Sequence, residues 1–278
     1  MTPRRPNRRL PNPTDRQIRN AVRVFGSFPA KLRAVLAVGL LLTLLGAGLL
    51  WLQSYNWDIE DALNGTRHSR GQSVSTGFAG SGVQTYGKAS EVLNGLEVSN
   101  SAAQSTYKRN LYGDPWADID SNGCDQRNDV LTRDLQNLEK NGECRVMAGT
   151  IIDPYTAETI HFERGPKTSE SVPIDHVVAL SNAWNSGAWQ WSYEKRVLLA
   201  NDPLNLQATG QRPNTEKSDK SADAWLPQPG YRCEYVARQV SVKASYGLSV
   251  TSAEKRAMAR VLSTCPEQPA YRSEFSRE

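Results

Sequence analysis

The sequence predicts an α+β domain that follows one N-terminal transmembrane helix, and three observations indicate this. Residues 34–52 form an uncharged, largely apolar run. Two β-rich stretches flank a Pro-containing turn within 146–162, which is a hairpin signal. Apolar residues recur at helical spacing in 125–140, 231–246 and 252–264. Helices and a local hairpin in one domain favour the α+β class.

Composition and charge narrow the class of protein. The chain has 278 residues, of which 22% are charged and 38% hydrophobic, and this excludes a wholly disordered or a polytopic membrane protein. No period of about 20 to 50 residues recurs, which excludes a repeat architecture. The formal charge is +4, but residues 1–33 alone carry +8. The basic charge therefore belongs to the N-terminal tail, and the rest of the chain is slightly acidic.

Residues 34–52 are predicted to be an uncleaved membrane anchor. As a helix this segment would span roughly 28 Å, close to the hydrocarbon thickness of a bilayer. The basic tail 1–33 precedes it, and the aromatic residues Trp51, Tyr55 and Trp57 stand at its other end. Because Lys and Arg stay on the cytoplasmic side, we expect the rest of the chain to be extracytoplasmic. A cleaved signal peptide is the alternative and would make the domain secreted.

The exported part is expected to contain a linker, one domain and a short tail. Residues 53–88 are rich in Gly and Ser and predict a flexible linker. Residues 89–268 hold the predicted elements, and residues 269–278 form a C-terminal tail. The helix predicted over 125–140 ends at Asn141-Gly142.

The four cysteines suit an exported domain. They form no closely spaced pair, so a structural zinc site is not expected, and an even number indicates disulfides. Three pairings are possible. We expect Cys124 with Cys144 and Cys233 with Cys265, because each bond would then join neighbouring parts of the chain.

Three short segments carry the residues suited to catalysis. An apolar strand in 172–180 contains Asp175-His176, a second short strand in 204–209 contains Asn205, and a polar helix start follows with Asn214. A single His is usually structural. Here, however, a carboxylate and an imidazole stand together on an otherwise apolar strand, where burial without a purpose is costly.

This order of residues resembles the HNH endonucleases, the ββα-metal superfamily. It is most similar to an exported type related to the nuclease domain of modification-dependent restriction enzymes. The resemblance extends over roughly residues 89–266. It implies a ββα-metal nuclease core with a β-hairpin and flanking helices.

The resemblance also implies a role for each residue. His176 would be the general base, and Asn205 would position the His176 loop and ring. Asp175 and Asn214 would hold Mg2+ (or Mn2+), since oxygen ligands favour a hard ion over zinc. Asp219 is a further possible ligand. The expected phosphate contacts are Lys217 and Arg164.

The resulting hypothesis is a membrane-anchored, extracytoplasmic, metal-dependent endonuclease whose partner is a nucleic acid, DNA first and RNA second. The sequence identifies no protein partner. Two alternatives stay open: a non-catalytic envelope or nucleic-acid-binding module on the same fold, and a hydrolase of small phosphodiesters. Retention of Asp175, His176 and Asn214 together favours the nuclease.

Overall fold

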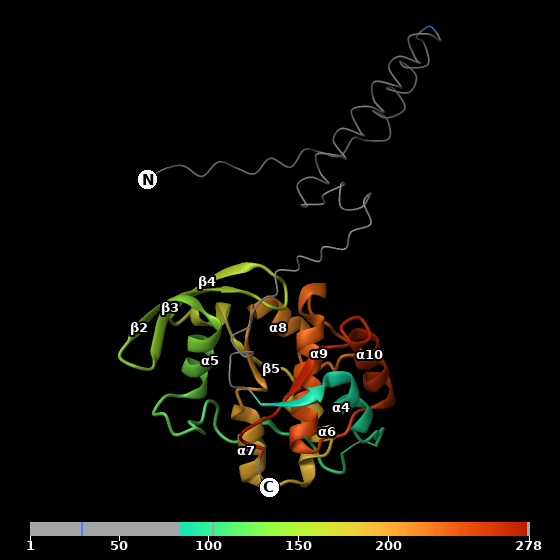
Figure 1. The fold of residues 1–278 in the computed structure, drawn as a ribbon. Helices are drawn as coiled ribbons and strands as arrows, with labels where there is room; N and C mark the ends of the chain where they lie inside the picture. The colour runs from blue at the N-terminus through green and yellow to red at the C-terminus, as the bar shows by residue number, and fades with distance from the viewer. Residues whose placement is uncertain (1–28, 30–83, 102, 277–278) are drawn as a thin grey trace, which may run out of the picture. The chain divides into compact units, whose positions relative to one another are not determined.

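The computed structural model describes residues 29, 84–101 and 103–276 (Figure 1). Apart from residue 29, the predicted tail 1–33 lies outside these residues, as do the anchor 34–52 and most of the linker 53–88. Among the described residues, none of the helices combines the length and hydrophobicity that crossing a bilayer requires.

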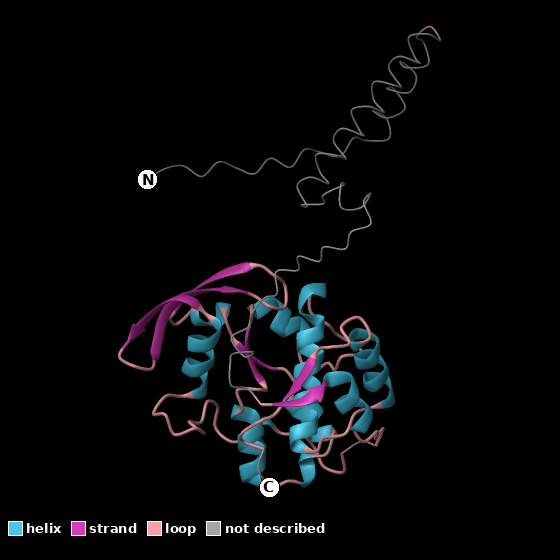
Figure 2. Cartoon of the chain, viewed as in Figure 1, coloured by secondary structure: helices cyan, strands magenta, loops and turns pink. Residues whose placement is uncertain are grey.

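The described residues form helices and three small antiparallel sheets, which confirms a mixed helix and strand class (Figure 2). The strands are β1 (Thr85–Lys88), β2 (Gln136–Asn141), β3 (Arg145–Ile152), β4 (Thr159–Glu163), β5 (Ile174–His176), β6 (Leu206–Ala208) and β7 (Pro269–Tyr271). The α-helices are α4 (Ala89–Gly95), α5 (Gln126–Asp134), α6 (Leu180–Asn185), α7 (Tyr193–Asn201), α8 (Gln211–Lys217), α9 (Arg232–Tyr246) and α10 (Ser252–Leu262). Short 3-10 turns include η2 (Arg109–Tyr112), η3 (Ser169–Ser171), η4 (Ala188–Gln190) and η5 (Pro229–Tyr231).

The predicted hairpin is confirmed and gains a third strand. Strands β3 and β4 pair antiparallel, with Ile151 opposite Ile160, and β2 pairs with the other edge of β3. The helix expected over 125–140 was therefore wrong in its second half. It ends at Asp134, whose carboxylate accepts the backbone N–H of Ala208 at 2.9 Å. Leu135 and Leu138 suit either periodicity, and pairing with β3 decides for the strand.

A ββα unit lies at the centre of the domain. Strands β5 and β6 pair antiparallel, with His176 opposite Leu206 and Asp175 opposite Gln207. Helix α8 follows β6 after Thr209 and Gly210. The two strands are shorter than the segments predicted for them but lie inside those segments.

Helices α9 and α10 form the predicted helical pair near the C-terminus. Thr251 and Glu254 make a capping box at the start of α10. Both expected disulfides are present: Cys233–Cys265 joins the start of α9 to the end of α10, and Cys124–Cys144 joins the segment before α5 to the β2–β3 turn.

The folded unit reaches slightly beyond residues 89–268. Strand β1 pairs with β7, and Thr85 lies opposite Tyr271. Residues 85–88 and 269–271, which the sequence assigned to the linker and the tail, thus join the domain. The larger core surrounds α9, and a smaller one lies beneath the three-stranded sheet.

Candidate active site

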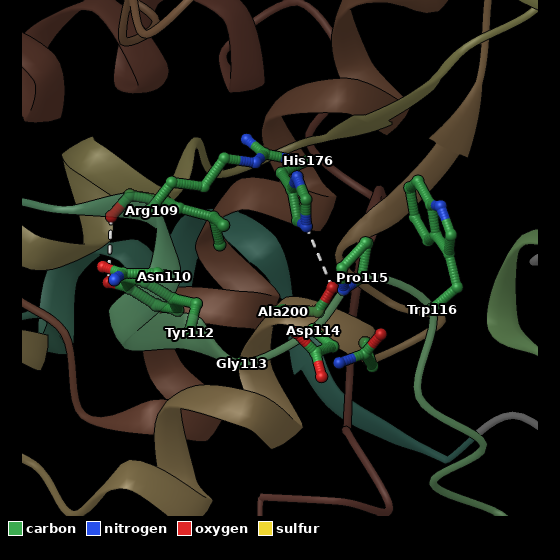
Figure 3. A pocket seen from close by; sticks show the side chains of 11 residues that line it. Arg109, Asn110, Tyr112, Gly113, Asp114, Pro115, Trp116, His176 and Ala200 are labelled. Atoms are coloured by element: carbon green, nitrogen blue, oxygen red, sulfur yellow. Dashed lines mark hydrogen bonds between the residues drawn. The ribbon is translucent and has the colours of Figure 1, made fainter.

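His176 stands at the end of β5 between two hollows. One hollow has a volume of about 470 Å³ and is also lined by Asp175, Asn214 and Asp219. The other has about 350 Å³ and is lined largely by residues 109–116 (Figure 3). The two hollows share His176, Arg109 and Leu180. A ring in this position can act on a molecule bound in either hollow.

The hydrogen bond of the His176 ring assigns its tautomer. Nε2 lies 2.9 Å from the backbone oxygen of Ala200, and a carbonyl only accepts, so Nε2 carries the proton. Nδ1 then holds a lone pair, and it makes no hydrogen bond within the described part of the chain. Burial lowers the pKa of His176 to about 3, so the ring is neutral near pH 7 and able to accept a proton.

Asp175 points to the other side of the strand and has buried partners. Its Oδ1 accepts a hydrogen bond from Lys217 Nζ at 3.0 Å, and its Oδ2 accepts one from the Tyr155 hydroxyl at 2.6 Å. Burial raises the pKa of the Asp175 carboxyl, and the Lys217 ammonium opposes this rise. The carboxylate still borders the larger hollow.

The position of Lys217 corrects its expected role as a phosphate contact. Its side chain is fully buried, and Nζ also donates to the backbone oxygen of His176 at 2.8 Å. The ammonium therefore neutralises Asp175 and fixes the end of β5, and it is not presented to a ligand. The alternation of a strand explains this, because Asp175 faces away from His176 and needs a cation of its own.

Asn205 hydrogen-bonds to the chain just after His176. Its Oδ1 accepts the Val178 N–H at 2.8 Å, and its Nδ2 donates to the oxygens of Val178 and Leu199, each at 3.3 Å. The His176 ring, however, is bound by Ala200 and not by Asn205. Asn205 is thus placed to position the loop, and α7 to position the ring.

Arg238 on α9 supports the same strands from behind. Its buried guanidinium donates to the backbone oxygens of Leu204 and Leu206, both at 2.8 Å through Nη2, and to the Gln207 side chain. Gln207 lies opposite Asp175 in the sheet. This arrangement fixes β6, and β6 in turn fixes β5.

Asn214 and Asp219 bring further oxygen atoms to the larger hollow. Asn214 is half-buried on α8, and its side chain makes no hydrogen bond to the described residues. Asp219 is exposed and accepts a hydrogen bond from Ser181 at 3.4 Å. No group of three or more His, Cys, Asp or Glu side chains gathers at metal-binding distance within 84–101 and 103–276.

Arg164 lies away from both hollows, which corrects its expected role as a phosphate contact. Its Nε donates to the Val146 oxygen at 2.6 Å, and one Nη donates to the Asn128 side chain at 2.7 Å. These bonds join the end of β4 to β3 and α5. Arg164 therefore stabilises the sheet.

Two residues near the His176 ring, Arg109 in η2 and Trp116 after it, were not identified from the sequence. Arg109 is exposed, borders both hollows and extends toward His176 (Figure 3). The Trp116 ring lies nearly parallel to the His176 ring, with the two ring centroids 6.5 Å apart. Residues 107–120 are aromatic and turn-rich, and nothing in their spacing relates them to β5.

Comparison with known proteins assigns the family. The family model described as GmrSD restriction endonucleases, C-terminal domain, matches residues 125–261. A protein of Arthroderma benhamiae, described as an uncharacterized secreted protein, is 38% identical over 180 residues, which cover 64% of this chain and 84% of the relative. This chain belongs to the GmrSD C-terminal domain family. No solved structure matches it.

The GmrSD C-terminal domain match contains most of the site and omits one wall. Asp175, His176, Asn205 and Asn214 lie inside residues 125–261, whereas η2 and Trp116 precede them. The family connects the chain with restriction endonucleases and so with nuclease activity.

Proposed function

We propose that the chain is a metal-dependent endonuclease of the HNH type, in which His176 activates water to hydrolyse a phosphodiester bond. One observation carries the proposal. His176 is held neutral with Nε2 bonded to Ala200, and it borders a hollow that Asp175 and Asn214 also line, on two antiparallel strands followed by a helix. The family match to restriction endonucleases supports it.

The chemistry of His176 follows from this tautomer. The Nδ1 lone pair takes a proton from water as the water oxygen attacks phosphorus, and the bond to the leaving oxygen breaks. The Nε2–H bond to Ala200 keeps the ring in one orientation during the transfer. The developing imidazolium is disfavoured by burial, and an anionic phosphate next to it offsets part of this cost.

The donor atoms of the larger hollow fit a hard cation. They are the amide oxygen of Asn214 and the carboxylate oxygens of Asp175 and Asp219, with no thiolate among them. Mg2+ binds through one or two such groups and retains several waters. Asn214 and Asp175 would hold it. The Asn214 side chain is the more available of the two, because both carboxylate oxygens of Asp175 already accept hydrogen bonds, from Lys217 and from Tyr155. The ion would neutralise the charge that develops on the phosphate oxygens.

Arg109 is the residue that we propose contacts phosphate, in place of Lys217 and Arg164. Its guanidinium is exposed and borders both hollows, so it can reach an anion beside His176 (Figure 3). Arginine suits this role because its planar donors match two phosphate oxygens. We propose a nucleic acid as the substrate, with DNA as the first choice, because the matched family is one of restriction endonucleases.

We also propose that the domain works outside the cytoplasm. Two disulfides are typical of exported domains, and the Arthroderma benhamiae relative is described as secreted. An anchor at residues 34–52 stays a sequence-based proposal.

Cleavage of supercoiled plasmid by the purified, oxidised full-length protein tests the metal proposal. We expect cleavage with Mg2+ or Mn2+ and none with EDTA. Asn214→Ala should raise the Mg2+ concentration for half-maximal cleavage roughly 10- to 100-fold, whereas Asn94→Ala, an exposed amide on α4, should not. Cleavage that persists in EDTA, or an unchanged Mg2+ titration for Asn214→Ala, would contradict the proposal.

A further inference from the structure

The smaller hollow beside His176 is separate from the proposed metal ligands. It has a volume of about 350 Å³, and its apolar lining includes Tyr112, Pro115 and Trp116. Neither Asp175 nor Asn214 lines it. The hollow on one side of the His176 ring is apolar, and the hollow on its other side is polar. The two hollows therefore suit two different parts of a substrate.

Two aromatic rings face each other across this hollow. The planes of Trp116 and His176 are inclined by 8°, and their centroids lie 6.5 Å apart. Figure 3 shows the two rings on opposite sides of the gap. Stacked rings in contact are spaced by roughly 3.4 Å, so with centroids 6.5 Å apart Trp116 and His176 are not in stacking contact, and both line the hollow between them.

The wall that carries Trp116 is fixed to the rest of the domain at three points. The Tyr112 hydroxyl donates to the Leu180 oxygen at 2.9 Å, and Arg196 Nε donates to the Leu111 oxygen at 2.8 Å. The Ala117 N–H donates to the Asn201 side chain at 2.9 Å. The gap is therefore preformed.

The backbone of this wall carries strain. Trp116 has φ of 65°, a left-handed conformation that is costly for a bulky residue. Gly113 has φ of 81°, and a side chain there would meet Val197 at 2.8 Å. Such strain persists where the surroundings enforce it and concentrates at functional sites.

We propose that the gap between Trp116 and His176 binds a nucleobase of the substrate, next to the phosphodiester that is cleaved. This inference rests on the proposed nuclease function. Base stacking is sequence-tolerant because every base has a π-face. Arg109 borders both the gap and the larger hollow. In this proposal it binds the phosphate group next to the nucleotide whose base lies in the gap.

The proposal defines the substrate class. A base enters the gap only after it leaves its neighbours in the strand, and unstacking is cheapest in single strands and at frayed or unpaired sites. The protein is therefore selective for unpaired nucleotides over intact duplex. Stacking between two rings does not read the edges of a base, so the stacking itself gives little preference among the bases.

Binding measured in EDTA, without turnover, tests the nucleobase gap. The probes are a short oligo-dT and an abasic strand of equal length and charge, each titrated into the full-length protein. Trp116→Ala should weaken binding of oligo-dT by roughly 5- to 150-fold, the usual effect of removing one stacking residue. It should leave binding of the abasic strand within about 2-fold, because the phosphate contacts are kept.

Matched variants keep the result interpretable. Trp116→Phe retains a stacking ring and should recover most of the oligo-dT affinity. Trp189→Phe, a half-buried Trp outside the gap, should bind as the unmodified protein does. Arg109→Ala should weaken both probes, whereas Arg260→Ala on the exposed face of α10 should weaken neither.

The outcomes distinguish a failure of the proposed nucleobase gap from a failure of the proposed nuclease function. Equal loss for both probes, or no loss in Trp116→Ala, overturns the nucleobase gap even if plasmid is cleaved. A base-dependent loss without any cleavage supports the gap and contradicts the proposed nuclease. Tighter binding of duplex than of oligo-dT would contradict the selectivity.

Discussion

At the scale of single residues, the proposed role of His176 follows from which of its ring nitrogens donates a hydrogen bond and which can accept a proton. Nε2 donates to Ala200, and this leaves Nδ1 as the acceptor. The Asp-His pair could be singled out from the sequence because an apolar strand that ends in polar side chains is unusual, and the two Asn residues because their order resembles that of the HNH endonucleases. The roles of Lys217 and Arg164 could not be predicted, since sequence does not show which carboxylates and carbonyls lie within reach of a long side chain.

The low pKa of His176 predicts how stability depends on pH. An unfolded His titrates near 6.5, while burial lowers the pKa of the folded group to about 3. Between these values the unfolded state binds more protons, so this contribution is fully present above about pH 6.5 and is lost as the pH falls toward 3. The slope from this group is at most about 1.4 kcal/mol per pH unit.

Urea unfolding at several pH values between neutral and mildly acidic measures this slope. His176→Leu should have a shallower dependence of the unfolding free energy on pH than the unmodified protein. Parallel pH dependences for the two proteins would show that His176 is not held neutral by the fold.

At the scale of elements, the site depends on how α8 and α9 are attached to two strands of three residues each. Lys217 joins α8 to Asp175 on β5, and Arg238 joins α9 to β6. Strands this short could be located in the sequence only through their polar residues. The helix predicted over 125–140 extended too far for a similar reason. The local spacing of apolar residues carries no information about the pairing of β2 with β3.

The buried Lys217–Asp175 pair predicts a stability effect that is larger for one substitution than for two. Lys217→Met leaves the Asp175 carboxylate buried beside Tyr155 without its cation, and this should cost roughly 3 to 5 kcal/mol of unfolding free energy. Adding Asp175→Asn removes the stranded charge and should recover much of the loss. Urea unfolding in EDTA provides the measurement, and a double variant no more stable than Lys217→Met would contradict the pairing.

At the scale of the whole molecule, the distribution of charge and the two disulfides bear on the proposed function. The part of the chain after residue 33 is slightly acidic, so the proposed binding of a nucleic acid would depend on a few placed groups such as Arg109 and on the proposed cation. The two disulfides brace the helices and the hairpin that surround the ββα unit. Fold class, disulfide pairing and the β5, β6 and α8 order could be predicted, whereas the wall at 109–116 required the three-dimensional arrangement.

The central claim is that His176 acts as the base of a nuclease, and plasmid cleavage by His176→Ala tests it most directly. The oxidised full-length protein and the variant are compared in Mg2+, with circular dichroism and thermal unfolding as controls of folding. We predict that the unmodified protein converts supercoiled plasmid to nicked or degraded forms and that the folded variant loses at least about 100-fold in rate. A folded His176→Ala protein with full activity would contradict the account.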